Sequence, residues 1–573
     1  MKSIEIQLSE WMNRAFRAAF PEVDLSGFPL GVTATTEEAF GDYQCNAAMG
    51  LARVLKKKPR DIAEAAIQAA APNPAIKKVD LAGPGFINIT LDEQALARYL
   101  EALQADQRLA VPRTGEGRTV VMDYSSPNVA KPMHIGHIRS TVIGNALDRL
   151  YRFLGYRVIA DNHLGDWGTQ FGLLILGYRH FLDPEAMKRN AVEELERLYV
   201  ESYERAQADE AWRDQARAEL VKLQKGDPEN EALWKQFGEL SLAEFEKIYA
   251  RLGVSFDLVR GESFYRDRLA GIVEELNQKG LAVESEGAQV VFLDDLKLPP
   301  CIVQKKDGGY NYATTDLATI RSRIMEFAPD KIVYVTDERQ QLHFRQLFAI
   351  AERMGCSTEL VHVWFGLMRL PGATFSTRQG NVIRLEKLLD EAETRALSIV
   401  RESSPSMSPE QQREIARAVG IGAVKYADLS QHPQSVVTFT WEKALALDGN
   451  SAPYLQYACA RIASVRDKYG ERFPDRNPID SPIRLEHPME RKLAVRIVRF
   501  PEAVERAAHQ FKPNVLADYL YDLAQAYSSF YQNVPFLKAE DEVRESRVRL
   551  CMLTEATLRK GLNLLGIETP DRI

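Results

Sequence analysis

Two histidines and a lysine lie within one short loop, at the junction between a predicted strand and a predicted helix. Lys131, His134 and His137 follow the apolar, β-rich run 119–124, and apolar residues at helical spacing from 138 onward predict the helix. A helix that begins near Gly136 would aim its unpaired N–H groups and the positive end of its dipole at the loop. Such donors can bind the phosphates of a nucleotide and stabilise charge during phosphoryl or adenylyl transfer.

The glycine between the two histidines strengthens this interpretation. Gly136 has no Cβ, so a flat purine could approach the backbone closely at that position. The spacing of His134 and His137 alone is also compatible with a chance pairing or with a metal site. No cysteine or acidic residue stands at zinc-like spacing, and Lys131 lies on the same loop, so nucleotide binding is favoured.

The bulk composition describes an ordinary globular protein of several domains. A chain of 573 residues is too long for one core, and 45% hydrophobic with 27% charged residues is typical of a folded, cytoplasmic protein. No apolar run approaches the roughly 20 residues of a membrane span, so we expect no membrane-spanning segment and no membrane partner. The five cysteines form no C-x-x-C pair, so we expect no structural zinc. The net charge of −7 does not exclude nucleic acid, because basic residues can gather on one face.

The run SSPNVAKPMHIGHIRST at residues 125–141 resembles the signature of a known enzyme family. Its centre resembles the HIGH signature of class I aminoacyl-tRNA synthetases, and the surrounding form is similar to that of arginyl-tRNA synthetases. The resemblance implies an arginine–tRNA ligase that uses ATP with Mg²⁺, makes arginyl-adenylate, and passes arginine to the 3′-terminal adenosine of tRNA(Arg). It gives Lys131, His134 and His137 the catalytic role, and these three with Gly136 the ATP site.

The chain pattern and the resemblance together predict the fold. The fold class is α/β, with a class I Rossmann-like parallel-sheet catalytic domain, an N-terminal α/β extra domain and a C-terminal α-helical anticodon-binding bundle. Alternating strands and helices predict the parallel sheet, and no G-x-G-x-x-G or P-loop pattern follows a strand. The expected parts are an N-terminal tRNA-elbow domain, the catalytic domain, its charged helical insertion, a connecting helical segment and the anticodon-binding domain, at 1–112, 113–396, about 177–260, 397–440 and 441–573.

Strand positions predict where a ligand would bind. Expected strands cover 119–124, 157–161, 331–336 and 360–365. The second is followed by NHLGDWGTQFG at 162–172, a polar, glycine-rich run of the kind that lies at the carboxyl ends of parallel strands, where α/β sheets bind ligands. This run is also similar to the corresponding run of the arginyl enzymes.

A tyrosine and an aspartate predict the amino-acid pocket. Tyr312 and Asp316 are four residues apart and converge if a helix begins between them, for which Thr315 is a possible N-cap before a helix over 317–325. A carboxylate takes a guanidinium in a two-pronged, charge-assisted pair, although a lone aspartate there is as readily a helix cap. The resemblance assigns the substrate guanidinium to Asp316, Tyr312 and Asp123. It assigns the backbone polar groups of the substrate to Asn128 and Gln340.

The second class I signature, the lysine-rich KMSKS loop, departs from its usual form here. The corresponding residues 374–381 read TFSTRQGN and contain neither lysine. Arginyl enzymes often carry a lysine just ahead of the HIGH residues instead, which is the position of Lys131. The resemblance therefore implies that Lys131 brings this positive charge to the ATP phosphates from another loop. It also implies that Ser376 and Arg378 are further ATP contacts.

Contacts with tRNA are expected at both ends of the chain. Phe86 and Asn88 alternate along a predicted strand, so they share one face and could stack on a base and bond its edge. A core phenylalanine and a turn asparagine are the alternative. Tyr454 and Tyr457 share one helical face and could stack on anticodon bases, unless they form a core stripe. The chain ends in Ile573, whereas the family usually ends in methionine.

Two other hypotheses for the function remain compatible with the sequence. A class I synthetase for cysteine or glutamate would share the HIGH geometry but should lack the paired acids. A tRNA-binding paralogue without activity would usually lose nucleotide-loop residues, which are intact here. The resemblance also implies a monomer, no editing domain, and activation of arginine only when tRNA is bound.

Overall fold

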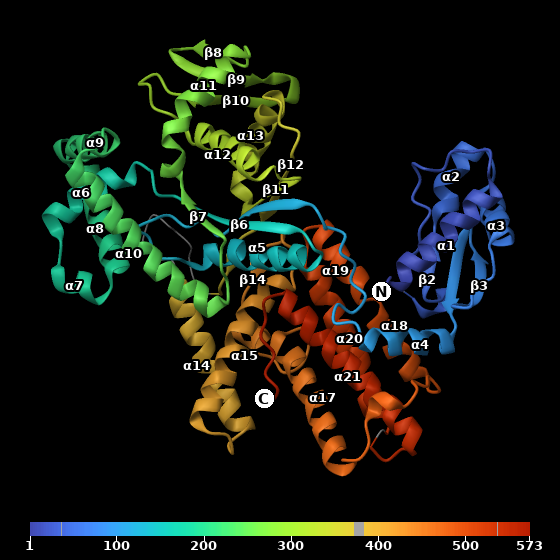
Figure 1. Cartoon of the computed structure of the whole chain (residues 1–573). Coiled ribbons are helices and arrows are strands. Elements are labelled where there is room, and N and C mark those ends of the chain that lie inside the picture. Colours follow the sequence, from blue (N-terminus) through green and yellow to red (C-terminus); the bar gives the residue numbers. More distant parts are fainter. Residues whose placement is uncertain (36, 372–382, 536) are drawn as a thin grey trace. The chain divides into compact units, whose positions relative to one another are not determined.

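The computed structural model describes residues 1–35, 37–371, 383–535 and 537–573 (Figure 1). Contacts divide the chain into two compact units, one made of residues 1–114 and 446–573 and the other of residues 115–445. The finer division into parts that the sequence suggested stays a prediction.

A five-stranded sheet organises the unit 115–445. Every neighbouring pair is parallel, and the strand order is β12-β11-β5-β6-β7. The four strands expected from the sequence are all present, and β7 is the additional one. Their bounds are β5 Thr119–Asp123, β6 Arg157–Leu164, β7 Leu258–Gly261, β11 Lys331–Asp337 and β12 Glu359–Phe365. The predicted parallel-sheet fold is therefore confirmed.

The strand order fixes where a ligand can bind. From β5 the chain moves to β6 on one side, while β11 and β12 lie on the other side, so the order reverses between β5 and β11. In open parallel sheets the ligand crevice lies at such a reversal, outside the carboxyl ends of the strands. The loop after β5 carries Lys131 and the N-cap His134, His137 lies in the first turn of the helix that follows, and the turn after β11 carries Gln340, so these residues follow the two strands that border the reversal.

Further elements are inserted between the strands or follow them. Five helices, α6 to α10, lie between β6 and β7 in the described part of the chain, and a three-stranded antiparallel sheet, β10-β9-β8, precedes β11. The remaining elements of this unit are α5 Ile135–Phe153, α6 Gln170–Phe181, α7 Pro184–Arg189, α8 Ala191–Ala208, α9 Glu210–Gln224, α10 Pro228–Leu252, α11 Leu269–Gln278, β8 Ala282–Ser285, β9 Ala288–Leu293, β10 Leu298–Gln304, α12 Tyr312–Phe327, α13 Gln341–Arg353, β13 Met368–Arg369, α14 Leu385–Ser403, α15 Pro409–Leu429, β14 Val437–Thr438 and α16 Trp441–Ala444.

A buried ion pair holds α5 in place. Nε of Arg139 on α5 donates to Oδ1 of Asp428 on α15 at 2.8 Å, and both side chains are excluded from solvent. The same guanidinium donates through Nη1 to the carbonyl oxygens of Gly366 at 2.7 Å and Ser435 at 2.9 Å. Buried charges persist only when paired and hydrogen-bonded. Helix α5, whose first turn carries both histidines, is therefore fixed against the segment that follows the sheet.

The other unit combines a small antiparallel sheet with helices. Its strands have the order β1-β2-β4-β3, and its carboxyl-terminal part is helical, which confirms the predicted N-terminal α/β and C-terminal helical parts. Nη2 of Arg491 binds Asp42 at 2.6 Å within this unit. The bounds are α1 Ile4–Ala19, β1 Thr33–Ala34, β2 Tyr43–Cys45, α2 Ala47–Leu55, α3 Pro59–Ala69, β3 Ile76–Ala82, β4 Phe86–Leu91, α4 Glu93–Gln104, α17 Ala452–Arg472, α18 Pro488–Val498, α19 Phe500–His509, α20 Pro513–Asn533 and α21 Asp541–Leu564.

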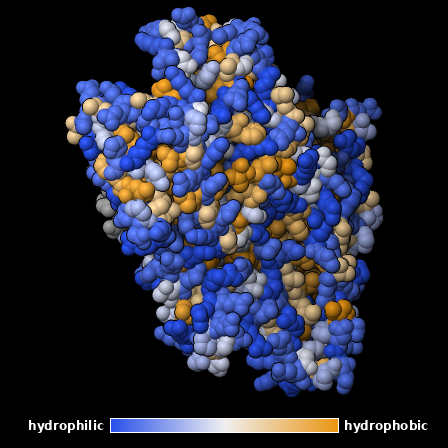
Figure 2. Space-filling view, turned by 60° about the vertical axis from the view of Figure 1, so that its left-hand side comes forward, coloured by the Kyte–Doolittle hydropathy of each residue, from blue (hydrophilic) through white to orange (hydrophobic). Residues whose placement is uncertain are grey.

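The surface is largely polar. Hydrophilic residues cover most of the face drawn in Figure 2, and hydrophobic residues appear there in separate groups. Among the helices in the described ranges, none combines the length and the hydropathy that a bilayer-spanning segment requires.

Candidate active site

The loop between β5 and α5 is strained and tied down on several sides. Ser125, Ser126 and Ala130 have φ values of 74°, 50° and 64°, in the left-handed region that side chains other than glycine rarely adopt. Strain of this kind persists only where the surroundings determine the conformation. Ser125 N donates to Oγ of Ser140 at 2.9 Å, and Ala130 N donates to Oγ of Ser241 at 2.9 Å. The loop that carries Lys131 is therefore held in one conformation.

The glycine-rich run after β6 supports the same loop. Val129 N donates to the carbonyl oxygen of Gly165 at 3.1 Å, and Gly165 N donates to that of Pro127 at 3.1 Å. A Cβ on Gly165 would lie 2.1 Å from Oδ1 of Asn128, so only glycine leaves room for that amide. The strand β6 runs through Leu164, three residues further than the sequence suggested. This run thus positions Asn128, one of the residues predicted to bind substrate.

The two histidines cap the helix reciprocally. Nδ1 of His134 accepts from Gly136 N at 3.0 Å, and Nδ1 of His137 accepts from His134 N at 3.0 Å. An accepting Nδ1 places the proton of a neutral imidazole on Nε2, so each ring presents an N–H donor on its other side. A Cβ on Gly136 would lie 2.7 Å from Cε1 of His134, which gives this glycine a role in the cap itself.

Both histidines are neutral near pH 7, because their pKa values are lowered. Burial lowers the pKa of His134 to about 4, with Arg339 and Lys131 adding to the effect. Burial also lowers the pKa of His137 to about 3, assisted by His134 and Lys131. The ring centroids are 3.9 Å apart. Two neutral donors beside a lysine can hydrogen-bond an anion without the desolvation cost that two buried imidazolium groups would carry.

These pKa values predict a pH response. We expect the ¹⁵N signals of His134 and His137 to stay those of neutral imidazole from about pH 8 down to about pH 5.5. The folded pKa values lie below the ordinary value of 6.5, so as the pH falls below 6.5 the unfolded chain binds more protons than the folded one. These groups thus lower the free energy of unfolding as the pH falls toward 4, and have no effect above 6.5. A titration midpoint near 6.5 for either ring, assigned with His134→Gln and His137→Gln, would contradict this.

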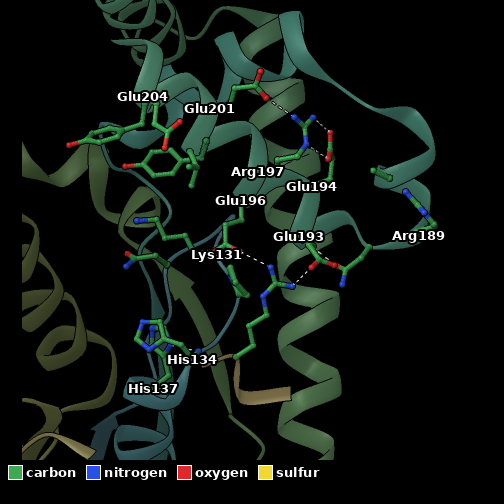
Figure 3. A pocket seen from close by; sticks show the side chains of 18 residues that line it. Lys131, His134, His137, Arg189, Glu193, Glu194, Glu196, Arg197, Glu201 and Glu204 are labelled. Carbon is green, nitrogen blue, oxygen red and sulfur yellow. Dashed lines mark hydrogen bonds and ion pairs between the residues drawn. The ribbon is translucent and has the colours of Figure 1, made fainter. Parts of the chain in front are cut away.

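Lys131 lines a large cavity together with the two histidines. Its Nζ lies 4.9 Å from the ring centroid of Tyr199 on α8, and burial lowers its pKa while nearby Glu196 opposes that shift. Figure 3 shows Lys131, His134 and His137 at one wall of the cavity and Glu193 and Glu196 facing them. The cavity has a volume of about 1350 Å³ and is lined by Asn128, Lys131, Pro132, His134, His137, Ala186, Arg189, Asn190, Glu193, Glu194, Glu196, Arg197, Tyr199, Val200, Glu201, Tyr203, Glu204 and Arg384.

The predicted tyrosine–aspartate pair lies in the first two turns of α12. This helix begins at Tyr312, earlier than the sequence suggested, and its N-cap is Asn311, whose Oδ1 accepts from Tyr312 N at 3.0 Å. The N-cap prediction for Thr315 is therefore wrong, because that residue lies inside the helix. Tyr312 is 61% exposed. Asp316 lies one turn further along α12, so both side chains can face one ligand.

A histidine on α13 joins this pair, and no local sequence pattern indicated it. Oδ2 of Asp316 lies 2.6 Å from Nε2 of His343, and the Tyr312 ring meets the His343 ring edge-on at 4.8 Å. Gln340 is exposed at the start of α13. A link between two helices that pack on the sheet orients the Asp316 carboxyl group before any ligand arrives.

Asp123 already has a partner within the chain. Nη2 of Arg323, from α12, donates to Oδ2 of Asp123 at 2.7 Å and to Oδ2 of Asp161 at 2.9 Å. Oδ1 of Asp123 accepts from Oγ of Ser126 at 2.9 Å. All three members of the Arg323 cluster are buried. Two carboxyl groups thus share one guanidinium beneath the crevice, so the neighbourhood of Asp123 has more acidic than basic groups.

One more acidic residue belongs to this region. Burial raises the pKa of Glu262; His163 opposes the shift, and Asp316 raises the pKa further. Burial also raises the pKa of Tyr334, and Asp123 and Asp316 both add to the shift, so the two aspartates lie near the same phenol. Glu262 directly follows β7, and its place after a parallel strand is the one signal that could have indicated it.

Other predicted site residues lie elsewhere. Ser376 and Arg378 fall in 372–382, outside the described residues. Asn88 on β4 is 6% exposed, and its Oδ1 accepts from Nε2 of Gln44 at 2.7 Å, while Phe86 is half-buried. On α17 the Tyr454 ring is half-buried, and Tyr457 is 40% exposed.

The Tyr457 ring takes part in an exposed aromatic and cationic cluster. The guanidinium of Arg461 lies 4.7 Å from the Tyr457 ring centroid and 5.1 Å from that of Tyr531. Tyr531 is itself 37% exposed. A cation stacked on two exposed rings is the kind of surface on which an unpaired base can stack.

Comparison with known proteins decides the family. Residues 99–441 match the family described as tRNA synthetases class I (R), catalytic domain. Residues 4–91 match the arginyl tRNA synthetase N terminal domain, and residues 455–573 match the DALR anticodon binding domain. The chain belongs to the arginyl-tRNA synthetase family. It is accordingly a class I aminoacyl-tRNA synthetase with the reaction of an arginine–tRNA ligase, as the resemblance implied.

Relatives of the arginyl-tRNA synthetase family match over nearly the whole chain. The arginine–tRNA ligase of Fusobacterium nucleatum is 46% identical over 569 residues, covering 99% of this chain and 99% of its own. That of Azotobacter vinelandii is 46% identical over 95% of each chain. The arginyl-tRNA synthetase structures from Plasmodium falciparum and Thermus thermophilus superpose with TM-scores of 0.84 and 0.83, at 26% and 25% identity, and cover 100% of both chains.

Proposed function

We propose that Lys131, His134 and His137, with the N-terminus of α5 at Gly136, bind the ATP that this ligase consumes. The observation that carries the proposal is the reciprocal cap, which leaves two neutral Nε2–H donors and a lysine on one cavity wall. Mg²⁺ enters as part of the substrate, bound to the polyphosphate. Ser376 and Arg378 are further ATP contacts in this proposal, on grounds of the resemblance alone.

The proposed chemistry requires little covalent work from the protein. A carboxylate oxygen of arginine attacks the α-phosphorus of ATP, the bond to the β-phosphate oxygen breaks, and pyrophosphate leaves with that electron pair. Negative charge that builds up on the phosphate oxygens meets donors already in position, which is worth about 2.7–4 kcal/mol per donor in comparable oxyanion sites. The 2′-hydroxyl of the terminal ribose of tRNA then attacks the arginyl carbonyl, and AMP leaves.

The proposed arginine pocket lies between α12 and α13. Asp316 receives the guanidinium, Tyr312 accepts or stacks on it, and Asn128 and Gln340 bind the substrate's backbone polar groups. The Asp123 and Asp161 carboxyl groups share Arg323, so Asp123 contributes to the pocket chiefly through the excess of acidic groups around it. Lysine is rejected because an ammonium cannot satisfy acceptors that are spaced for a planar guanidinium.

The proposed tRNA contacts are Phe86, Asn88, Tyr454 and Tyr457. The exposed Tyr457 ring beside Arg461 supports this assignment most strongly, and the burial of Asn88 makes it the weakest of the four. We further propose that the protein acts in the cytoplasm as a monomer and activates arginine only with tRNA bound.

The tRNA contact is tested by measuring the attachment of radiolabelled arginine to tRNA. Radiolabelled lysine is the negative control, because it should not be attached. Tyr457→Ala is expected to raise the KM for tRNA about tenfold, because one base–aromatic stack is worth about 1–3 kcal/mol. The dissociation constant for arginine should not change. Tyr457→Phe keeps the ring and should keep the KM, and an equal loss in both variants would assign the effect to the hydroxyl group and contradict stacking.

A further inference from the structure

The cavity that contains the proposed ATP site has an acidic opposite wall. Glu193 and Glu196 lie one turn apart on α8, so they share one face, and that face lines the same cavity as Lys131 and His134 (Figure 3). A polyphosphate is strongly anionic, so carboxylates that face it oppose its binding. Something in the chain must offset these two glutamates if ATP is to occupy the cavity.

Arg384 is placed to provide that offset. Its Nη2 lies 3.0 Å from Oε2 of Glu196, and its Nη1 pairs with Oε1 of Glu193, so one guanidinium serves both acids. The side chain is 25% exposed. The Glu196 side chain is 34% exposed and that of Glu193 is 51% exposed, so solvent screens the pair with Glu196 less than the pair with Glu193.

The backbone fixes Arg384 to the helix cap that carries the histidines. Leu385 N donates to the carbonyl oxygen of Met133 at 2.9 Å, and Ile135 N donates to that of Ile383 at 3.1 Å. These bonds pair the segment antiparallel with the chain on either side of His134. Arg384 therefore lies on the segment that pairs with the N-cap histidine, and its side chain extends to α8.

Glu196 has a second cation within electrostatic range. It raises the pKa of Lys131 against the opposing effect of burial, so the two charges interact. The Lys131 ammonium lies over the Tyr199 ring while Arg384 holds the carboxylate. Without Arg384, the carboxylate of Glu196 would still attract the ammonium of Lys131, and a lysine bound to a glutamate is a poor phosphate ligand.

We propose that Arg384 is a positioning residue that neutralises Glu193 and Glu196 and so keeps Lys131 available to the ATP phosphates. The proposal rests on the assignment of the ATP polyphosphate to Lys131, His134 and His137. It does not require Arg384 to touch ATP. Its role is electrostatic, so it should depend on the two glutamates and not on Arg384 alone.

The test compares four variants in arginine-dependent ATP–pyrophosphate exchange with tRNA present. Arg384→Ala is expected to raise the KM for ATP about tenfold. Adding Glu193→Gln and Glu196→Gln to it should return the KM to within about threefold of wild type, because the two carboxylates with which Arg384 pairs are then absent. Arg384→Lys keeps the charge and should stay close to wild type. The double glutamine variant with Arg384 intact should have a KM for ATP below that of wild type.

Each alternative role for Arg384 produces a different pattern. If Arg384 contacts phosphate directly, or serves only to hold the backbone, the added glutamines will not rescue Arg384→Ala, and the proposal is overturned. If Arg384→Ala does not fold, the double glutamine variant decides, since an unchanged KM for ATP overturns the proposal. Lys131→Ala is the reference: a normal KM for ATP together with a normal exchange rate in that variant would refute the ATP site itself, whereas failure of the Arg384 set alone leaves it standing.

Discussion

Replacing Lys131 by alanine is expected to lower arginine-dependent ATP–pyrophosphate exchange about 100- to 1000-fold. The loss corresponds to about 2.7–4 kcal/mol, the cost of removing one preorganised donor to a developing oxyanion. Lys131 is the lysine on the cavity wall beside the two capping histidines, and residues 374–381 supply no lysine to replace it. Exchange is measured at saturating arginine and tRNA over a range of ATP concentrations.

Arginine binding should be almost unaffected by this change, because Lys131 lies on the β5–α5 loop and the proposed guanidinium pocket lies on α12 and α13. Lys247→Ala is the matched control, since Lys247 is exposed on α10 and pairs with Glu244 away from the cavity. Equal losses in arginine binding and exchange for Lys131→Ala would refute the idea that this lysine replaces the absent KMSKS lysine.

Asp316→Asn is expected to raise the KM for arginine about 30-fold to several thousandfold. Truncating one partner of a desolvated, hydrogen-bonded charge pair costs about 2–5 kcal/mol. The amide fills the same space but cannot form the charge-assisted pair with a guanidinium. The KM for arginine and that for ATP are measured separately by the exchange reaction.

The binding of ATP should stay within about twofold in this variant. Glu284→Gln, on the exposed strand β8, removes a carboxylate from the same unit and should change neither constant. His343→Gln separates two effects, because it removes the Asp316 partner and leaves the carboxylate: a smaller rise in KM is expected for it. Weakened ATP binding in Asp316→Asn with normal arginine binding would mean that the residue is misassigned.

The sequence predicted the sheet and the loop that carries the histidines because both follow from local pattern. Strand β5 is a short apolar run, and the helix after it has apolar residues at the regular spacing of a buried face. Carboxyl ends of parallel strands meet at one edge, so the polar runs after β5 and β6 converge. The contact between Asn128, after β5, and Gly165, after β6, shows that these two runs meet.

Long-range partners could not be predicted in the same way. Arg323 lies 200 residues after Asp123, so no local spacing shows that the two are bonded. The bond between His343 and Asp316 joins two helices that only the tertiary fold brings together. Arg384 is similar, since its partners on α8 come from an inserted helix of another part of the sequence.

Local competition between capping residues explains one error. Thr315 has the side chain of an N-cap and precedes an apolar helical run, yet the helix begins earlier, at Tyr312. Asparagine ranks above threonine as an N-cap, and Oδ1 of Asn311 accepts from the first helical N–H. The start of the apolar run favoured Thr315, but the residue type of the cap favoured Asn311.

ATP–pyrophosphate exchange with the purified protein, run with arginine, lysine, glutamate or cysteine, each with and without tRNA, is the most direct test of the proposed arginine pocket. We predict exchange with arginine alone, and only when tRNA is present. Exchange with arginine that does not need tRNA would contradict the proposed tRNA requirement and leave the pocket standing. Exchange with another of these amino acids would contradict the assignment of Asp316 and Tyr312 to a guanidinium, and with it the central claim.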